Sequence, residues 1–411
     1  MKLERYSAYR DSGIEWLGEI PEDWNLIKLK YLANIKTGEK DTVDKEDNGI
    51  YPFFVRSKDI KTINTYTYNE EAVLTAGDGD IGKIFHYING KFEYHQRVYK
   101  FSHFKYITGK YLYYYLHHNL EQEVVKLSAK TTVDSLRLPM LQNFNVLVPP
   151  KQEQQKIASF LDKKTKQIDQ AIEQKEQLIE LLKERRQILI NDAVTKGLDR
   201  TVAMKDSGVE WIGEIPEHWE VKKNKYLFFE VDERSKEGKE ELLSVSHMTG
   251  VTPRSEKNVN MFMSEDYTGS KTCSKNDLVI NIMWAWMGAM GVSDRTGIVS
   301  SSYGIYRQIK KNTINSIYLE YLLKTNKYIE EYNKRSTGLH ASRLRLYTDM
   351  FFDMKIGFAP KEEQKRIIDF IEKNNQKIDK AINLQQQQIK KLKEYKTTLI
   401  DSVVTGKVKV S

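Results

Sequence analysis

The chain contains two copies of one sequence plan. The segment Asp11–Trp24 (DSGIEWLGEIPEDW) returns 195 residues later as Asp206–Trp219 (DSGVEWIGEIPEHW), with eleven of fourteen positions identical. A second repeat begins at Pro150 (PKQEQQKI) and returns 210 residues later at Pro360 (PKEEQKRI). Repeats at a long, fixed period are the signature of a fold built from duplicated units. Each copy therefore predicts a short tag, a globular region and a long helix, in that order.

The repeats divide the 411 residues into four parts. We expect an N-terminal tag and first globular domain over residues 1–149, followed by a first spacer helix over 150–196. The repeated tag and a second globular domain occupy 197–359, and a second spacer helix occupies 360–411. A chain of this length is long enough for two or three domains, each with its own core.

Both spacer helices carry the apolar spacing of a coiled coil. Isoleucine and leucine step by three, four and seven residues, as at the a and d positions of a heptad. The seven positions match one for one between the copies: Ile157, Leu161, Ile168, Ile172, Ile179, Leu182 and Leu189, and Ile367, Ile371, Ile378, Ile382, Ile389, Leu392 and Leu399. Such a seam can also pack on the chain's own domain, but two equal seams in one chain favour pairing with each other.

We expect the two helices, ending near residues 190 and 400, to pair as an antiparallel coiled coil with pseudo-two-fold symmetry. Because each helix follows its own globular region, antiparallel pairing would carry the two regions to opposite ends of the pair. A helix of about 38 residues is about 57 Å long at 1.5 Å per residue. That length suits a spacer between half-sites on duplex DNA, which recur on one face about every 34–36 Å.

The globular regions, about 25–149 and 220–359, share this plan but little sequence, which favours two different targets. Short β-branched and aromatic runs such as YPFFV, KIFHYI and VYKF predict strands. One helix is expected at Tyr106–Leu127, with its counterpart at Ser316–Tyr332. The predicted fold class is α+β, with two mixed globular domains each followed by a long helix.

Charge and composition favour a polyanionic partner in a reducing compartment. The net charge is +8, which suits nucleic acid but also fits a basic protein without such a partner. The single cysteine, Cys273, excludes an internal disulfide and a cysteine-based zinc cluster. The N-terminal residues lack a secretory signal, and the most apolar run, Leu278–Val292, is too short for a membrane helix and contains Asn281. We expect a cytoplasmic protein with no membrane partner, and this run in a buried strand and turn.

Basic, amide and hydroxyl residues gather in loops of both globular regions. Arginine can hold guanine through two hydrogen bonds, glutamine can hold adenine, and serine or threonine can contact phosphate or base. The candidate DNA-binding residues of the first region are Arg56, Lys58, Lys83, Gln96, Arg97, Lys130, Thr131, Thr132 and Arg137. Those of the second are His247, Thr249, Trp286, Tyr303, Arg307, Arg335, Ser336, Thr337, His340, Arg343 and Arg345. A solvated loop or a core position would explain any single one of them equally well.

No enzyme motif accompanies these loops. The run from Gly77 to Lys83 has the spacing of a phosphate-binding loop, but Ile84 replaces the required Ser or Thr, and Asp78 and Asp80 would repel phosphate. No NPPY-like or DPPY-like adenine-methyltransferase motif occurs, and the only Pro-Pro is Pro149-Pro150. We therefore predict a non-catalytic chain that binds no cofactor and no metal.

The duplicated tags EWLGEIPEDW and EWIGEIPEHW, the helix openings PPKQEQQKI and APKEEQKRI, and the two-domain layout together resemble the specificity subunits of type I restriction–modification systems. The resemblance covers essentially the whole chain. It implies a subunit that reads a bipartite site on double-stranded DNA, one half-site per domain, and directs adenine methylation or restriction by its partners.

The resemblance also implies the partners and their cofactors. They would be two methyltransferase subunits that use S-adenosylmethionine, docked on the charged outer faces of the spacer helices, and restriction subunits that use ATP and Mg²⁺. Two alternatives stay open from the residues. One is a self-contained nuclease or methyltransferase with a divergent site, and the other is a coiled-coil scaffold that binds only protein.

Overall fold

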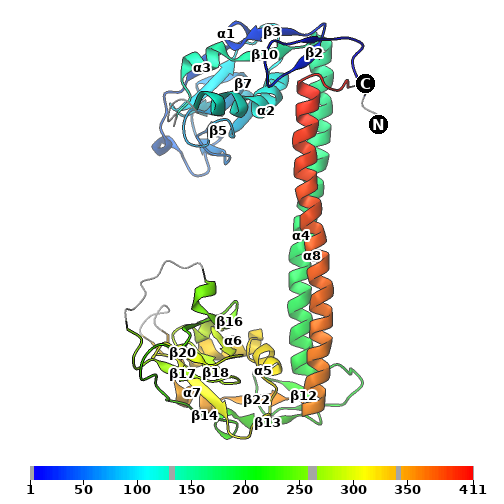
Figure 1. Cartoon of the computed structure of the whole chain (residues 1–411). Helices are drawn as coiled ribbons and strands as arrows, with labels where there is room; N and C mark the ends of the chain where they lie inside the picture. The colour runs from blue at the N-terminus through cyan, green and yellow to red at the C-terminus, as the bar shows by residue number, and fades with distance from the viewer. Residues whose placement is uncertain (1–3, 129–134, 258–265, 339–343, 411) are drawn as a thin grey trace. The chain divides into compact units, whose positions relative to one another are not determined.

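The computed structural model describes residues 4–128, 135–257, 266–338 and 344–410. The chain divides into two compact units, unit 1 with residues 1–176 and 385–411, and unit 2 with residues 177–384. Each unit holds one globular domain and part of both long helices, because α4 (Lys151–Lys196) begins in unit 1 and ends in unit 2, while α8 (Lys361–Val404) does the reverse (Figure 1).

Unit 1 is a mixed α/β domain on a six-stranded sheet. Its elements are β1 (Tyr9–Asp11), β2 (Glu19–Pro21), β3 (Asn25–Lys28), α1 (Leu29–Leu32), β4 (Asn34–Thr37), η1 (Thr42–Asp44), β5 (Tyr51–Phe54), β6 (Lys61–Ile63), β7 (Tyr68–Ala76), β8 (Phe85–Tyr94), β9 (Val98–Ser102), α2 (Gly109–Ser128), α3 (Leu138–Asn143) and β10 (Asn145–Val148). The strand order in the sheet is β4-β9-β7-β8-β5-β6, with β5 parallel to β8 and the other pairs antiparallel.

The period of two in the strands builds the core of this sheet. Ala72 and Leu74 on β7, and Phe92 and Tyr94 on β8, alternate along their strands and are buried together with Phe54 of β5. Alternate residues of a strand point to one face, so these side chains form a single apolar layer. The helix α2 packs against β7 and β8.

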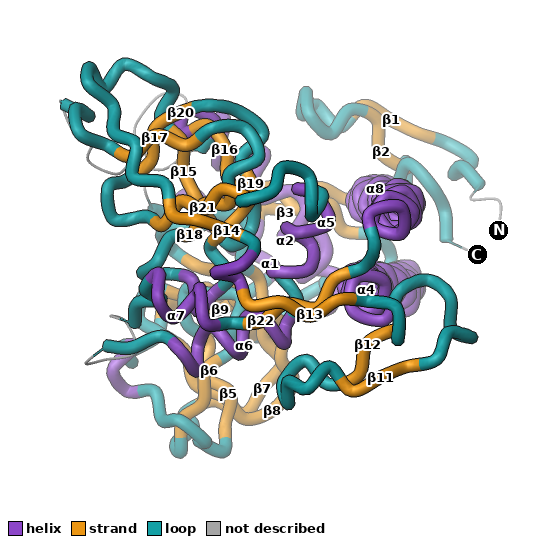
Figure 2. The backbone as a smooth tube through the Cα atoms, turned by 90° about the horizontal axis from the view of Figure 1, so that it is seen from below, coloured by secondary structure: helices purple, strands orange, loops and turns teal. Residues whose placement is uncertain are grey.

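Unit 2 is also mixed α/β, but its strands are shorter. Its elements are β11 (Met204–Asp206), β12 (Glu214–Pro216), β13 (Glu220–Lys223), η2 (Asn224–Tyr226), β14 (Phe228–Glu230), β15 (Leu243–Ser246), β16 (Gly250–Pro253), η3 (Arg254–Glu256), β17 (Lys271–Cys273), β18 (Leu278–Ile280), η4 (Ala285–Met287), β19 (Met290–Val292), β20 (Gly297–Val299), β21 (Gly304–Gln308), α5 (Ser316–Leu323), α6 (Asn326–Arg335), α7 (Thr348–Asp353) and β22 (Lys355–Phe358). A four-stranded sheet has the order β14-β21-β18-β19, and β13 pairs separately with β22, the strand that precedes α8 (Figure 2).

The local elements follow the sequence pattern with three differences. The helix expected from Tyr106 begins at Gly109, because Tyr106 adopts a left-handed backbone with φ 60°. The counterpart helix breaks into α5 and α6, since Thr325 is the N-cap position of α6 and its hydroxyl donates to the Leu322 carbonyl. The spacer helices run a few residues beyond the expected ends.

The apolar run Leu278–Val292 forms β18, η4 and β19, as the prediction of strand and turn required. The two strands are largely buried, but Trp284 and Met287 in the turn are exposed. Among the described helices, none combines the length and the apolar character needed to cross a membrane.

The long helices pair antiparallel, as predicted, and the evidence comes from each unit separately. In unit 1 the Lys396 ammonium contacts Asp169 at 2.7 Å, and Lys175 donates to Gln385 and Gln388. In unit 2 Arg186 of α4 contacts Asp379 of α8. Within unit 1 the residue number falls along α8 as it rises along α4, which only antiparallel helices produce.

The predicted seam is the buried face of this pair. Five of the seven seam residues in each helix are less than a tenth exposed: Ile157, Leu161, Ile168, Ile172 and Ile179 on α4, and Ile367, Ile371, Ile378, Ile389 and Leu399 on α8. The other four seam residues are partly buried. Coiled-coil packing requires buried residues at the a and d positions and solvent-exposed residues on the outer face.

Each tag seats against the end of one helix and the start of the other. Gly197, after α4, has φ 74° and lies against the Trp219 ring, while Gly406, after α8, has φ 76° and lies against Pro21 and the Trp24 ring. A left-handed residue after a helix end favours glycine, and a Cβ at Gly406 would overlap Pro21. Trp24 and Trp219 are each 1% exposed. The repeated tag therefore packs into the core at the end of a long helix in both units.

A matched glutamine completes the duplicated scaffold. Gln154 accepts from the Thr108 amide and donates to the Tyr106 and Pro149 carbonyls. Gln364, its repeat counterpart, accepts from the Asn315 amide and donates to the Ala359 carbonyl. Both amides are almost fully buried, so the same side chain ties the opening of each long helix to its own globular domain.

Candidate nucleic-acid interface

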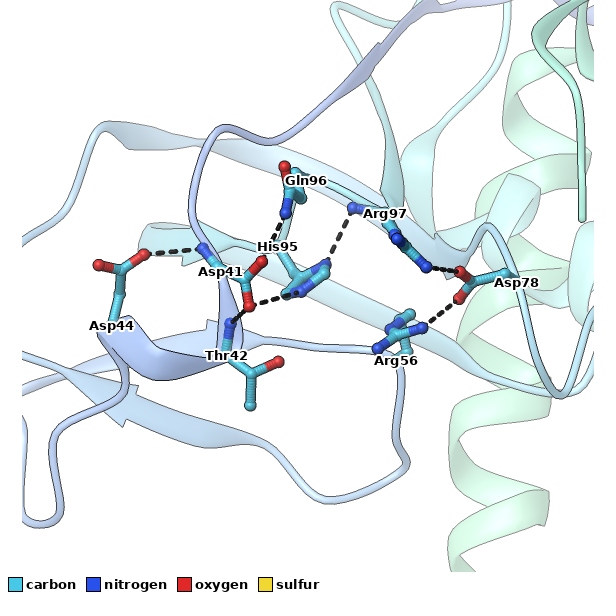
Figure 3. A network of polar contacts seen from close by, with 8 residues as sticks. All are labelled: Asp41, Thr42, Asp44, Arg56, Asp78, His95, Gln96 and Arg97. Atoms are coloured by element: carbon cyan, nitrogen blue, oxygen red, sulfur yellow. Dashed lines mark hydrogen bonds and ion pairs between the residues drawn. The ribbon is translucent and has the colours of Figure 1, made fainter.

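Three loops of unit 1 meet at one aspartate. Arg56 follows β5, Asp78 follows β7, and Arg97 lies in the turn between β8 and β9. The Asp78 carboxylate accepts from Arg56 Nη1 at 2.8 Å and from Arg97 Nη1 at 3.0 Å (Figure 3). Both arginines are candidates from the sequence, and the structure brings them together through Asp78. The sequence had indicated Asp78 only as a residue that would repel phosphate.

The turn that carries Gln96 and Arg97 is built around a buried histidine. His95 is 2% exposed, its Nδ1 accepts from the Arg97 amide at 2.9 Å, and its Nε2 lies 3.7 Å from Asp41 Oδ1. Burial lowers the pKa of His95 more than the nearby Asp41 raises it, so the ring is neutral at pH 7 with its proton on Nε2. Gln96 donates from its side chain to Asp41, which fixes the turn on its other side (Figure 3).

A close backbone approach holds the Asp78 loop against this turn. The Gly77 amide donates to the Arg97 carbonyl at 2.8 Å, and a Cβ on Gly77 would lie 2.8 Å from that oxygen. Gly77 in turn accepts from the Leu136 amide at 2.7 Å, which brings the segment containing Arg137 to the same edge. Glycine is therefore required at position 77 by the packing of three chain segments.

The electrostatics of the cluster keep the aspartate charged and the arginines oriented. Burial raises the pKa of the Asp78 carboxyl, but the hydrogen bonds from Arg56 and Arg97 lower it more, so the net pKa lies below its ordinary value. The side chains of Arg56 and Arg97 are 41% and 61% exposed. Among the described residues no other hydrogen bond engages either guanidinium, so each presents further N–H donors to solvent.

The other candidates of the first region are more scattered. Lys58 is exposed near the Arg56 loop, Arg137 is exposed at the start of α3, and Lys83 lies 3.6 Å from Glu121. Lys130, Thr131 and Thr132 lie outside the described residues.

In the second region, the candidate Arg307 makes its hydrogen bonds to acidic residues of its own domain. Arg307 donates from Nε and Nη2 to both carboxylate oxygens of Asp277, each at 2.8 Å, and from Nη1 to Glu233 at 3.1 Å. Asp277 is 1% exposed. This arrangement pins β18 to β21 rather than offering a fork to a ligand, so the structure gives Arg307 a structural contact.

The remaining basic candidates of unit 2 lie near the end of α6. Arg335 donates to Glu331 at 2.6 Å and lies 3.7 Å from Asp353. Ser336 is buried, and its hydroxyl donates to the Tyr332 carbonyl. Thr337 and Arg345 pair through both backbone hydrogen bonds and are exposed, whereas His340 and Arg343 lie outside the described residues.

Two loops of unit 2 expose apolar and aromatic side chains beside the predicted ones. His247 and Thr249 are exposed in the β15–β16 turn, and Met248 between them is 80% exposed. Trp286 is partly buried and donates to the Met283 carbonyl, but Trp284, stacked on it with centroids 5.8 Å apart, is 46% exposed. Tyr303 is partly buried and accepts from Asn281.

The described residues of the candidate interface therefore offer mainly exposed hydrogen-bond donors. Outward guanidinium and amide donors suit base edges and phosphates. In the part of the chain that the structure describes, no group of three or more His, Cys, Asp or Glu side chains is arranged to hold a metal ion.

Comparison with known proteins finds one family model and several similar chains. Residues 21–181 match the model of the type I restriction modification DNA specificity domain. The type I restriction enzyme EcoDI specificity subunit of Escherichia coli is 28% identical over 53% of this chain, and the match covers 44% of that subunit. The MjaVIII specificity subunit of Methanocaldococcus jannaschii is 26% identical over 95% of this chain and 94% of that subunit.

A solved structure shares the fold along almost the whole chain. It is described as the structural basis of complex assembly and conformational transition of the type I R-M system, and it has a TM-score of 0.67 with 11% identity. The match covers 94% of this chain and 98% of that chain. The comparisons therefore find a DNA specificity domain over residues 21–181 and a fold shared with a type I R-M structure along almost the whole chain.

The domain model over residues 21–181 and the relatives along the chain confirm that this chain is similar to the specificity subunits of type I restriction–modification systems, as its sequence indicated. DNA target recognition is the role of this family, and catalysis is carried out by partner subunits.

Proposed function

We propose that this chain reads a bipartite target on double-stranded DNA, one half-site per globular domain, and delivers it to partner enzymes. The observation that carries the proposal is the convergence of Arg56 and Arg97 on Asp78, with further donors of both arginines turned to solvent. A guanidinium held on one side and open on the other can meet the O6 and N7 atoms of guanine, the commonest specific contact in the major groove.

The domains of this proposal are those of the repeat: residues 1–149 and 197–359 read DNA, while 150–196 and 360–411 set the spacing between the two readers. Buried seam residues in both units support a fixed spacer, since a packed helix pair resists changes in length. Inserting one heptad into α4 alone should abolish recognition or assembly, because the two seams would lose their common register. A variant with unchanged activity would contradict the spacer role.

The partners of this proposal are two methyltransferase subunits and restriction subunits. The methyltransferase subunits would modify adenine with S-adenosylmethionine, and the restriction subunits would use ATP and Mg²⁺. The duplicated helices, with charged outer faces in both copies, support two docking sites of one kind. The complex would work in the cytoplasm, where its DNA is.

The decisive experiment couples the chain to its methyltransferase partner and maps methylated adenines across a genome. The expected result is a motif with two specific halves around a nonspecific gap. Arg97→Ala should change or erase one half of the motif and leave the other half intact. A contiguous motif, or methylation or cleavage of DNA by the purified chain alone, would overturn the proposal.

A further inference from the structure

Asp78 occupies an unusual place for an acidic residue in a DNA-binding surface. It lies between two arginines whose outward donors are proposed above to meet DNA, and it is itself 19% exposed. A carboxylate near a phosphate backbone opposes binding by charge repulsion. Asp78 should therefore lower the affinity of this surface for DNA of any sequence. A further role of the residue would offset that loss.

The geometry supplies that role. Arg56 and Arg97 come from different loops, and each has a long side chain with considerable rotamer freedom. Asp78 takes one Nη1 donor from each arginine, using one carboxylate oxygen per guanidinium. The two forks are thereby tethered to one point, and the loop that carries Asp78 is itself held by the Gly77–Arg97 backbone hydrogen bond.

We propose that Asp78 is a specificity-determining positioning residue, which fixes the Arg56 and Arg97 guanidiniums for base edges and restrains them from contacting phosphates. This inference rests on the proposed DNA-reading function of unit 1. A free arginine follows the nearest phosphate, since that contact is independent of sequence. An arginine tethered by a carboxylate has part of its charge offset, so it gains most where a base edge matches its fork.

The same loop provides a matched control. Asp80 lies two residues further along, is exposed, and makes no ion pair among the described residues. Asp78→Asn and Asp80→Asn remove the same charge from the same loop, but only the first releases the arginines. The difference between the two variants therefore isolates positioning from net charge.

The test measures binding by the full chain to two probes at several salt concentrations. One probe is a duplex carrying the motif found by methylation mapping, and the other is a duplex of the same length with scrambled sequence. Asp78→Asn should bind the scrambled duplex several-fold more tightly, with a steeper salt dependence by up to about one phosphate contact. The ratio of target to scrambled affinity should fall about tenfold, whereas Asp80→Asn should shift both probes alike.

A conservative variant guards against a merely structural effect. Asp78→Glu keeps the charge and moves the carboxylate by one methylene, so it should restore the wild-type salt dependence. If Asp78→Asn unfolds the domain, Asp78→Glu carries the test alone, and a target-to-scrambled ratio that is still reduced at wild-type salt dependence supports positioning.

The outcomes separate this inference from the proposed function. If Arg97→Ala weakens target binding but Asp78→Asn behaves like Asp80→Asn, or Asp78→Glu leaves the ratio at its wild-type value, the positioning role is wrong and the interface stands. If neither Arg97→Ala nor Arg56→Ala alters binding to either probe, the interface itself is misplaced and the positioning role falls with it.

Discussion

The two globular domains use arginine and aspartate in opposite ways. In unit 1 Asp78 lies near the surface and holds two arginines that stay 41% and 61% exposed. In unit 2 Asp277 is 1% exposed and takes two donors of a single arginine, Arg307, whose third contact goes to Glu233. Asp78 orients two exposed arginines, and Asp277 ties the start of β18 to β21.

The exposed chemistry differs accordingly. Unit 1 presents guanidinium and amide groups around the β8–β9 turn, whereas unit 2 presents Met248 and Trp284 on neighbouring loops. Apolar side chains read thymine methyl groups, and arginine or glutamine forks read purine edges. A common scaffold with different surface chemistry is what two unlike half-sites require.

The largest expected effect is on the free energy of unfolding, which should fall much more when Asp277 is replaced than when Asp78 is replaced. Asp277→Ala should lower the free energy of unfolding of unit 2 by about 2–4 kcal/mol, because it leaves a partly buried Arg307 with only Glu233 and a longer contact to the Ser274 hydroxyl. Asp78→Ala should cost unit 1 about 1 kcal/mol or less, since its partners are solvated. Denaturant unfolding of both variants measures the difference, and equal losses would remove the distinction drawn here.

The two copies of the scaffold should respond equally to the same substitution, unlike the two surfaces. Gln154→Ala and Gln364→Ala should each lower the free energy of unfolding of their unit by about 2–3 kcal/mol, because each strands buried backbone groups without a partner. The two losses should agree within about 1 kcal/mol. Thermal melting of the full chain detects this, and a strong effect in only one unit would show that the duplicated openings of α4 and α8 are not equivalent.

The sequence predicted the scaffold well because repetition made its periodicity visible twice. The seam, the helix pairing and the tags were all predicted from positions that recur with the same neighbours, such as Ile157 and Ile367. Local chemistry that breaks a helix was harder to see: Thr325 splits the expected helix of unit 2 although no proline or glycine marks the break.

The candidate interface was only partly predictable, since residue type does not reveal what a side chain contacts. Arg56, Arg97 and Arg307 look alike in the sequence, yet one pair faces solvent and the third is held by Asp277. The sequence did not identify Asp41 or Asp78 as members of the candidate interface: Asp78 was interpreted only as an obstacle to phosphate binding, and nothing in the pattern singled out Asp41. A signal did exist: Gly77-Asp78-Gly79 is a tight turn directly after a buried strand, where a side chain can be placed with little freedom.

The contrast in surface chemistry can be sharpened through Trp284. Trp284→Ala should weaken binding of the target duplex by about 1 kcal/mol, roughly fivefold, without changing the salt dependence, because an indole neutralises no phosphate. Asp78→Asn, by contrast, should steepen the salt dependence, because it lets the Arg56 and Arg97 guanidiniums reach phosphates. Titrations of the full chain at three salt concentrations distinguish the two, and a salt effect from Trp284→Ala would argue against apolar reading by unit 2.

The smallest expected effect is a loss of stability at low pH. It depends on the histidines, which differ in burial between the two units. In unit 1 the buried ring of His95 faces Asp41, Asp78, Arg56 and Arg97, and its pKa is lowered chiefly by burial. A group whose pKa is lower in the folded state than in the unfolded state favours folding most above its unfolded pKa, about 6.5 for histidine. That contribution is lost as the pH falls from about 6.5 through the lower folded pKa.

Unit 1 should therefore lose stability between pH 7 and pH 5, and His95→Asn should reduce this loss by about 1 kcal/mol or less. The asparagine carbonyl can accept from the Arg97 amide as Nδ1 does, but it does not titrate. A residual slope comes from His86 and His117, whose pKa values are also lowered chiefly by burial, that of His117 to about 4. In unit 2 the described histidines, His218 and His247, are exposed, so neither is a buried counterpart of His95. Unfolding curves at pH 5, 6 and 7 test both statements: a His95→Asn slope equal to that of the native chain would mean that the buried ring does not control the turn carrying Gln96 and Arg97.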